Sequence, residues 1–285
     1  MSTPPRSVEV TLVHEWDKGQ VRQVQDYLAG EEPLEIRVNG LPLTVTMRTP
    51  GHDLDLAAGF LLTEGLIQRR SQIAAMGYAE SCKDTERGNI VEIALEAGIS
   101  LELERTRRNF FAGSSCGICG KASIESVRVR GIPRPGAGMR VDPEILCRLP
   151  DLLRGAQPVF QRTGGLHAAG LFTVAGRLVE QREDVGRHNA VDKIVGWALG
   201  EDRIPLSDSI LLVSGRGGFE IVQKAAVAGM PMVVSISAPS SLAVRLAREM
   251  GMTLVGFLRA ERFVVYAGEE RLEMASRPAV VEMRR

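Results

Sequence analysis

The sequence predicts an α/β protein with a three-layer C-terminal domain built on a mainly parallel mixed sheet, preceded by a smaller N-terminal α+β domain. From Gly165 onward, short apolar segments alternate with amphipathic segments of helical period. Strand–helix–strand connections at this spacing are crossovers, which give parallel strands covered by helices on both faces. In the first half, alternating segments separated by turn dipeptides instead indicate hairpins beside one helix. We therefore expect an N-terminal domain over residues 1–112, a loop over residues 113–130 and an α/β domain over residues 131–285.

The composition is that of an ordinary globular protein without an electrostatic bias. Lys+Arg and Asp+Glu are equal at 35 each in 285 residues, and 44% of the residues are hydrophobic. This balance provides no global attraction to nucleic acid or to a membrane surface. The N-terminal residues contain no apolar segment typical of signal peptides, and no apolar run approaches the length that spans a bilayer. We expect a cytoplasmic protein with neither a nucleic-acid nor a membrane partner.

The N-terminal elements are predicted from alternation and from turn residues. Residues 1–30 are polar and are expected to form only a lead-in to the domain. Residues 33–50 alternate apolar and polar positions on either side of Asn39-Gly40, a dipeptide that favours a type I′ hairpin turn. Asp53 is placed to cap a helix whose apolar residues follow at helical spacing. Residues 89–104 alternate again and predict two strands around an Ala-Gly turn.

The C-terminal elements are predicted from helix caps and from breaks at glycine and proline. Asp142 is placed to cap a helix with Pro143 as its first residue, and Pro150 is expected to break that helix. A hairpin around Ala175-Gly176 precedes a helix that ends at Gly200. The remaining strands are expected within residues 209–215, 231–237, 253–258 and 262–267, and the remaining helices within residues 219–230 and 240–251.

Two cysteines three positions apart, Cys116 and Cys119, lie in the glycine-rich segment SSCGICGK. A closed zinc site needs four ligands, but Cys82 and Cys147 are isolated, and the four histidines form no HxxxH pair. The zinc deaminase pattern of HxE followed by PCxxC is also absent. We therefore expect no structural metal, with a zinc-binding module kept as one alternative.

A redox disulfide and a persulfide carrier are the other two interpretations of the cysteine pair. Thioredoxin-like enzymes place CxxC at a helix start directly after a strand, and no clear strand leads into this segment. A persulfide carrier needs an exposed, partly ionised thiol that reaches both a donor and an acceptor. Nearby cations favour the thiolate, and the flanking glycines favour a mobile loop. These cations are Arg105, Arg107, Arg108 and Lys121.

Glycine-rich and serine-rich turns follow two neighbouring strands and predict an anion-binding crevice. The segment SGRGGFE leads from a strand into a helix, and its glycines allow backbone N–H groups to approach a ligand. It matches neither a Walker loop nor GxGxxG, so a tight turn that simply requires glycine is an equal alternative. The segment SISAPSS repeats the arrangement after the next strand. Because parallel strands end at one edge of a sheet, both turns are expected to line one crevice that takes a phosphate.

Three further segments carry candidate polar groups for the same site. In EDVGRHNAVDK, His188 and Asp192 are four residues apart and share one face of the predicted helix, although each charge alone fits an ordinary solvated helix start. His167 opens a strand after two glycines, where a lone histidine is more often structural. Arg259 and Arg262 lie between two strands and are placed to clamp a phosphate, with a charged hairpin tip as the equal alternative.

Eight motifs in order make the chain resemble the formate dehydrogenase accessory sulfurtransferases known as FdhD. The resemblance covers residues 33–266 and is specific because the motifs occur together and in sequence. The motifs are RVNG, TPGHDLDLAAGFLLTEGLI, SSCGICGKASIE, TGGLHAAG, EDVGRHNAVDKIVG, SGRGGFEIVQKAAVAGMP, SAPSSLAVRLA and TLVGFLR.

The resemblance implies a function, a fold and partners. Such proteins accept sulfur from a cysteine desulfurase as a persulfide on the residue that matches Cys116, with Cys119 in an auxiliary role. They pass it to the molybdenum bis(molybdopterin guanine dinucleotide) cofactor, a bound substrate, before that cofactor enters formate dehydrogenase. The family's larger domain is similar to cytidine deaminases without their zinc ligands, and its members form homodimers. A cofactor-binding chaperone that does no chemistry is the alternative function.

The residues expected to bind the cofactor come from both lines of reasoning. The turns and the polar segment indicate Ser214, Gly215, Arg216, Gly217, His188 and Asp192, and the resemblance indicates Phe257, Leu258, Arg259, Ala260, Glu261 and Arg262.

Overall fold

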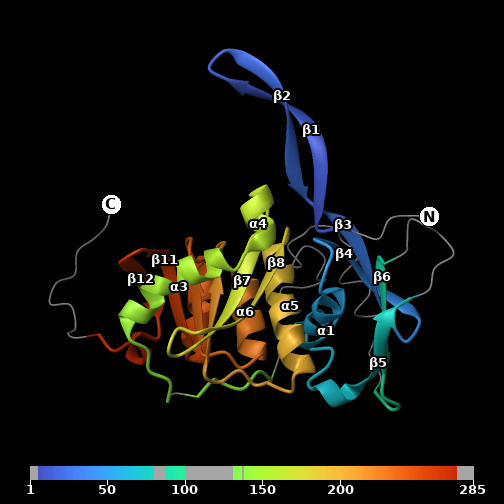
Figure 1. Ribbon diagram of the computed structural model, residues 1–285. Coiled ribbons are helices and arrows are strands. Elements are labelled where there is room, and N and C mark those ends of the chain that lie inside the picture. Colours follow the sequence, from blue (N-terminus) through green and yellow to red (C-terminus); the bar gives the residue numbers. More distant parts are fainter. Residues whose placement is uncertain (1–5, 80–87, 100–130, 137, 275–285) are drawn as a thin grey trace.

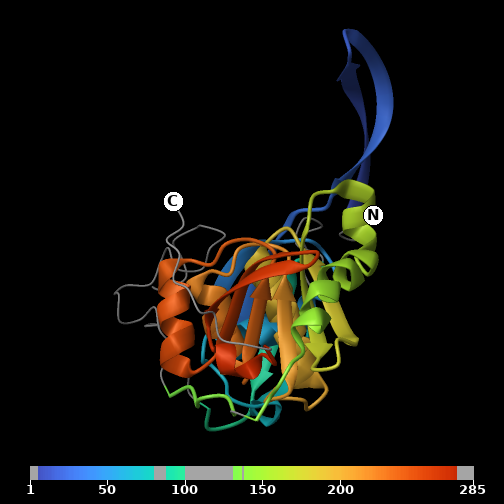
Figure 2. The ribbon, with the colours of Figure 1, turned by 90° about the vertical axis from the view of Figure 1, so that its left-hand side faces the viewer.

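The computed structural model describes residues 6–79, 88–99, 131–136 and 138–274. They form a central α/β body, a smaller sheet beside it and a long hairpin that projects away from both (Figure 1). Figure 2 shows from a second direction that the hairpin extends clear of the body. No helix within these residues is both long and apolar enough to span a membrane.

A six-stranded mixed sheet in the order β12-β11-β10-β9-β7-β8 forms the centre of the body. The middle strands β9, β10 and β11 are mutually parallel, as the crossover spacing predicts. β7 runs antiparallel to both β8 and β9, and β12 runs antiparallel to β11, which confirms the mixed sheet and the hairpin predicted around Gly176. The strands are β7 (His167–Thr173), β8 (Leu178–Asp184), β9 (Ser209–Val213), β10 (Met232–Ser235), β11 (Thr253–Arg259) and β12 (Arg262–Ala267).

Helices cover both faces of this sheet and give the expected three layers (Figure 1). In the middle strand β9, Leu211 and Val213 join the core beneath α5, α6 and α7, whereas Ile210 and Leu212 join the core beneath α3. A strand that is apolar on both sides is typical of a sheet covered on both faces. The helices are α3 (Pro143–Gly155), α5 (Arg187–Gly200), α6 (Phe219–Val227) and α7 (Ser241–Met250).

A four-stranded sheet in the order β4-β3-β6-β5 forms the N-terminal unit, and α1 connects it to the body. The predicted hairpin is confirmed, with Asn39 and Gly40 in its turn at positive φ. Leu34 and Ile36 of β3 belong to the same apolar core as α1, α5 and α6, so the two units share one core. The elements are β3 (Glu32–Val38), β4 (Leu41–Arg48), α1 (Asp53–Thr63), β5 (Ile73–Tyr78) and β6 (Ile90–Leu95).

Two glycines allow α1 and α5 to pack backbone against backbone. A Cβ atom on Gly59 would lie 1.9 Å from the carbonyl oxygen of Asp192, and one on Gly196 would lie 1.8 Å from the carbonyl oxygen of Asp55. Neither helix has room for a side chain at this crossing. α5, whose first turn carries His188, is therefore packed closely against α1.

The structure corrects the expectation for the first 30 residues. They are not a simple lead-in, because β1 (Val8–Asp17) and β2 (Gln20–Ala29) form a fully paired antiparallel hairpin. Lys18 and Gly19 make its turn, both with positive φ. The apolar residues of β1 alternate, but the polar composition of β2 obscured the pairing in the sequence.

Two helix boundaries differ from expectation. Asp53 does not cap α1, because His52 occupies the cap position and the Asp53 carboxylate instead accepts hydrogen bonds of 3.1 and 2.9 Å from the buried Arg48 guanidinium. Pro150 lies inside α3 and does not break it. A proline removes one backbone hydrogen bond, and the apolar contacts of Leu146 and Leu149 hold the helix on the sheet.

Three short elements complete the comparison. Sequence reasoning missed β5 and the helix α4 (Pro158–Thr163). The first strand predicted within residues 89–104 is confirmed as β6, and its expected partner at residues 100–104 lies outside the described residues.

Candidate functional site

The sequence motifs that carry polar groups meet at one edge of the six-stranded sheet. β9, β10 and β11 end there, and β7 begins there because it runs in the opposite direction. The backbone N–H of Ala168 donates a 2.9 Å hydrogen bond to Ser214 Oγ, which ties the start of β7 to the end of β9. The carboxyl edge of an open α/β sheet is where such folds usually bind ligands. We call this region the carboxyl-edge site.

The glycine-rich and serine-rich turns lie side by side at this edge, as predicted. The Ser240 N–H donates to the Gly217 carbonyl oxygen at 3.1 Å, which joins the two turns. A Cβ atom on Gly217 would lie 3.1 Å from Ser235 Oγ, so glycine permits the close approach. Ser240 itself caps α7 by accepting from the Ala243 N–H, and its hydroxyl is thus used by the fold.

The end of β11 joins the same site. The Phe257 N–H donates to the Ser237 carbonyl oxygen, and the Arg259 guanidinium donates a 2.6 Å hydrogen bond to the Ile236 carbonyl oxygen. Phe257 adopts a left-handed φ of 53°, which is strained for a residue with a Cβ. Strained conformations of this kind cluster at functional sites.

The remaining residues of this segment are divided between surface and core. Leu258 is buried beneath α3 as part of the core, so the structure does not present it to a ligand at this edge. Arg216 in the neighbouring turn and Ala260, Glu261 and Arg262 are exposed.

The start of α5 contributes buried polar atoms with no partner among the described residues. His188 is 7% exposed, and its Nε2 lies 2.7 Å from Glu220 Oε2 in the first turn of α6. His188 Nδ1 and Arg187 Nε are buried without a hydrogen-bond partner in the described part of the chain. Unpaired buried polar atoms are costly. Arg187 Nε is a donor, and together with the first N–H groups of the long helix α5 it suits an anionic group such as a phosphate.

A cavity of about 370 Å³ opens beside this edge, and His167 lines it. The ideal Cβ position on Gly215 lies 3.4 Å from His167 Nδ1 and 3.5 Å from Arg187 Cδ, which places this histidine against the glycine-rich turn. Burial, followed by the positive charge of Arg187, lowers the pKa of His167. The lining residues are Arg154, Gln157, Phe160, Gly164, Gly165, Leu166, His167, Val185 and Ser214.

The lowered pKa of His167 predicts a loss of stability on acidification. Below the ordinary histidine pKa of 6.5, the unfolded chain takes up a proton on this histidine, whereas folded His167 resists protonation. The stability that the neutral histidine contributes is therefore present above pH 6.5 and is lost as the pH falls. His167→Gln is expected to reduce the loss in the free energy of unfolding between pH 7.5 and pH 5.5. Urea unfolding of both proteins at each pH measures the difference, and equal losses in the two proteins would contradict the assignment.

Asp192 does not reach the carboxyl-edge site, contrary to the expectation from helical spacing. It is buried between α1, α5 and α6, where its carboxylate accepts hydrogen bonds from Lys224 Nζ at 2.9 Å and from Thr63 Oγ1 at 2.7 Å. Positions four apart share a face of a helix, but that face is wide enough to contact different neighbours. His188 meets the site, and Asp192 joins a buried ion pair.

Asp184 is a structural centre that sequence reasoning did not single out. It is completely buried, and its carboxylate accepts from the backbone N–H groups of Thr49 and Gly186, from Asn189 Nδ2 and, as an ion pair of 2.7 Å, from Lys193. These contacts account for much of the polar density of EDVGRHNAVDK. The motif thus fixes the position of the start of α5 at the site. Most of its polar side chains are bonded within the protein and do not face a ligand.

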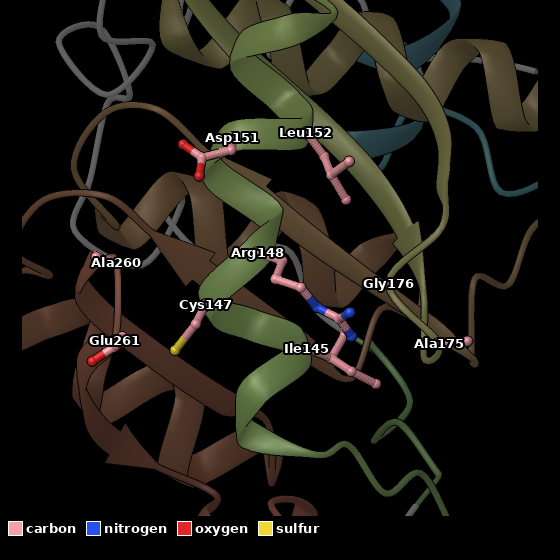
Figure 3. Close-up of a pocket in the computed structure, with 9 residues that line it drawn as sticks. All are labelled: Ile145, Cys147, Arg148, Asp151, Leu152, Ala175, Gly176, Ala260 and Glu261. Carbon is pink, nitrogen blue, oxygen red and sulfur yellow. The ribbon is translucent and has the colours of Figure 1, made fainter.

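A second cavity, of about 630 Å³, lies along α3 (Figure 3). In Figure 3, Cys147 points toward Ala260 and Glu261, whereas Arg148 points toward the turn at Gly176. Burial, followed by the nearby carboxylates, raises the pKa of the Cys147 thiol. A thiol with a raised pKa carries little thiolate, which favours a structural role for this cysteine.

The two cysteines of the CxxC segment, Cys116 and Cys119, lie outside the described residues, as does the rest of the expected loop. Their assignment therefore stays a prediction. Within the part of the chain that is described, no three His, Cys, Asp or Glu side chains cluster in a way that could hold a metal ion.

Comparison with known proteins identifies relatives over nearly the whole chain. Residues 29–273 match the FdhD/NarQ family. A protein of Streptomyces avermitilis named sulfur carrier protein FdhD is 51% identical over 265 residues, covering 92% of this chain and 94% of that protein. A protein of the same name from Mycobacterium tuberculosis is 49% identical over 259 residues, and the match covers 89% of this chain and 94% of that protein.

A solved structure has the same fold. It is the crystal structure of a protein from Desulfotalea psychrophila described as a formate dehydrogenase accessory protein. The match has a TM-score of 0.75 and 24% sequence identity, and covers 93% of this chain and 99% of that one. At this identity the likeness concerns the fold. With half of the aligned residues identical to those of its relatives and the family match extending from the end of β2 to beyond β12, the chain belongs to the FdhD/NarQ family.

Proposed function

We propose that the protein is a sulfur carrier that holds sulfur as a persulfide on Cys116 and transfers it to the molybdenum bis(molybdopterin guanine dinucleotide) cofactor for formate dehydrogenase. The observation that carries the proposal is the 51% identity, over 92% of the chain, to a protein named sulfur carrier protein FdhD. The description of the Desulfotalea psychrophila protein agrees with the proposed recipient. The proposed sulfur donor is a cysteine desulfurase, and the proposed compartment is the cytoplasm.

Loading the carrier is an exchange of one sulfur–sulfur bond for another. The Cys116 thiolate attacks the terminal sulfur of a persulfide on the desulfurase. A new bond forms between this sulfur and Cys116 while the donor's own bond breaks, and the donor cysteine leaves as a thiolate. No external oxidant is needed, because the transferred sulfur keeps its oxidation state. This is covalent nucleophilic catalysis.

Cys119 has an auxiliary role in unloading. Its thiolate attacks Cys116, which forms a disulfide between the two cysteines and releases the carried sulfur as hydrosulfide. A cellular thiol then reduces the disulfide and restores the pair.

The carboxyl-edge site is the proposed place of the acceptor. Its joined turns present backbone N–H groups at the start of α6 and α7, and the exposed Arg216 and Arg262 supply positive charge that suits the phosphates of guanine nucleotides. The unpaired Nε of Arg187 provides a donor for an anionic group. The cofactor is substrate here, and the chain's own groups bind and orient it.

The proposal is tested by loading the purified protein with sulfur. It is incubated with a cysteine desulfurase and cysteine, and its intact mass is measured with peptide mapping. We expect a mass increase of one sulfur atom on Cys116 that reductant removes and that Cys116→Ser abolishes. Cys147→Ser is the matched control and is expected to load like the wild type, because its thiol is partly buried with a raised pKa.

The alternative is a cofactor-binding chaperone that does no sulfur chemistry. The same sample then shows no adduct on either Cys116 or Cys119 while guanosine diphosphate still binds. That combination would overturn the carrier mechanism and leave the binding site intact.

A further inference from the structure

Two helices begin side by side at the carboxyl-edge site without a capping side chain. α5 begins after Gly186 and α6 begins after Gly218, and no side-chain hydrogen bond caps either helix. The first N–H groups of an α-helix have no partner within the helix. Together with the helix dipole, they make each start a donor site for an anion. A specific ligand is indicated only where a further group between the two starts lacks a partner.

A buried pair of side chains connects the two helix starts. His188 is the second residue of α5 and Glu220 is the second residue of α6. His188 Nε2 lies 2.7 Å from Glu220 Oε2, and the two side chains are only 9% and 12% exposed. The imidazole ring therefore occupies the space between the two starts, away from bulk solvent.

This pair leaves the second ring nitrogen of His188 as a buried acceptor. An ionised carboxylate only accepts hydrogen bonds, so the proton of the neutral imidazole lies on Nε2, facing Glu220. Nδ1 then carries a lone pair, and it is buried without a hydrogen-bond partner among the described residues. A buried acceptor that stays unpaired costs free energy. A ligand that donates one hydrogen bond to Nδ1 would remove this cost.

The charges around the pair favour an anion. The side chain of Arg187 has a buried Nε atom that no described residue pairs, and it lies against the glycine-rich turn at Gly215. The negative charge of Glu220 interacts with the buried ammonium group of Lys224 and is partly balanced by it. The positive ends of α5 and α6 add to the same space. The space thus combines several donors for a negative charge with one acceptor for a hydrogen.

We infer that the space between the starts of α5 and α6 is a binding site for hydrosulfide on its way from Cys116 to the cofactor. Hydrosulfide is a monoanion that carries one hydrogen. The helix N–H groups and Arg187 hold its charge, and its S–H group donates to His188 Nδ1. The choice of hydrosulfide among small protonated anions rests on the proposed function, in which the carried sulfur leaves as this ion.

Burial separates this site from the place of the nucleotide phosphates. Because His188 and Glu220 are almost completely covered, only a ligand of very few atoms reaches the space between them. Arg216 and Arg262 are exposed and remain available to the larger phosphate groups. Sulfur and cofactor are therefore held at neighbouring positions of one edge, the sulfur inside and the phosphates outside.

A serine at the start of α6 tests the site without weakening the fold. Gly218 has φ −77° and ψ 169°, and a Cβ atom there meets nothing within 4 Å. In Gly218→Ser, the hydroxyl is expected to accept from an N–H group in the first turn of α6, as Ser240 does in α7, and so to occupy a donor of the site. Gly218→Ala adds the Cβ without the hydroxyl and is the matched control.

Binding is measured by equilibrium dialysis of the full-length chain against sodium hydrosulfide at pH 8 without oxygen. All proteins carry Cys116→Ser and Cys119→Ser, which prevents reaction of the ligand with these cysteines. We expect saturable binding, at least about tenfold weaker binding in Gly218→Ser and a much smaller change in Gly218→Ala. In thermal unfolding, Gly218→Ser is expected to be at least as stable as Gly218→Ala.

Bromide tests the role of the hydrogen on the ligand. It has the same charge as hydrosulfide but no hydrogen to donate, so it leaves His188 Nδ1 unpaired. Competition dialysis is expected to show hydrosulfide bound at least about tenfold more tightly than bromide. Equal binding of the two ions would show a general anion site and overturn the inference.

The remaining outcomes distinguish this site from the carrier mechanism. Absent hydrosulfide binding, or binding that Gly218→Ser leaves unchanged, would overturn the inference even if Cys116 of the wild type loads with sulfur as proposed. Binding that depends on Gly218 in a protein whose Cys116 never loads would support the site and overturn the carrier.

Discussion

Gly196→Ala is expected to destabilise the protein by about 3 kcal/mol or more, near the upper end for overpacking a core. The added Cβ would lie 1.8 Å from the Asp55 carbonyl oxygen, so α1 and α5 must separate. The obstacle is backbone, which cannot rotate away as a side chain can. Separation also disturbs the Asp55 carboxylate, which accepts a 3.0 Å hydrogen bond from Arg182. The start of α5 at the carboxyl-edge site is expected to shift with it.

The measurement is urea unfolding of Gly196→Ala beside Gly200→Ala. Both substitutions are made in α5, but a Cβ at Gly200 meets nothing within 4 Å. Gly200→Ala is therefore expected to be neutral or to stabilise the protein by up to about 1 kcal/mol, because alanine favours the helix. Equal unfolding free energies for the two variants would contradict the close-packing interpretation of α1 and α5.

The α/β half could be predicted from the sequence because its local signals agree with one another. α7 begins after a serine cap at Ser240 and ends at Gly251 in a left-handed conformation, as its sequence indicates. β9 is buried throughout, and every residue after Ser209 is apolar. When caps, periodicity and glycine breaks all indicate the same boundaries, tertiary contacts do not shift the ends of the helices and strands.

The first hairpin could not be predicted in the same way because none of its residues is buried. Its exposed apolar residues, such as Trp16, alternate with charged ones, but no buried face distinguishes it from a polar lead-in. The one helpful local signal is the turn at Lys18 and Gly19. β5 was missed because Ile73 is its one fully buried residue.

The candidate site could be predicted in its backbone and less well in its side chains. Parallel strands end at the same edge of a sheet, so the turns that follow them were expected to be neighbours. The hydrogen bond between the Ser240 N–H and the Gly217 carbonyl oxygen confirms this. Sequence spacing does not show which neighbour covers a helical face, so Asp192 was assigned to the site when Lys224 in fact holds it in the core. Whether a charged residue serves the fold or a ligand depends on partners far away in the sequence.

Cys116→Ala is expected to abolish the activation of formate dehydrogenase. In a host without its own FdhD protein, the wild-type chain is expected to restore formate dehydrogenase activity, and the variant is expected to lose on the order of 100-fold or more of it, because the carrying thiol is the nucleophile. Cys147→Ala is the matched control and is expected to retain activity, since that thiol is partly buried on α3 with a raised pKa.

The same assay separates the carrier from the chaperone when Arg216→Ala is added. Arg216 is exposed in the glycine-rich turn, so its removal is expected to weaken binding of guanosine diphosphate without unfolding the protein. A carrier requires both the thiol and the nucleotide site, and both variants are expected to lose activity, with Cys116→Ala still binding the nucleotide. A chaperone requires only the nucleotide site. Full activity of Cys116→Ala beside a defective Arg216→Ala would therefore exclude the persulfide mechanism while keeping the carboxyl edge of the sheet as the place where the cofactor binds.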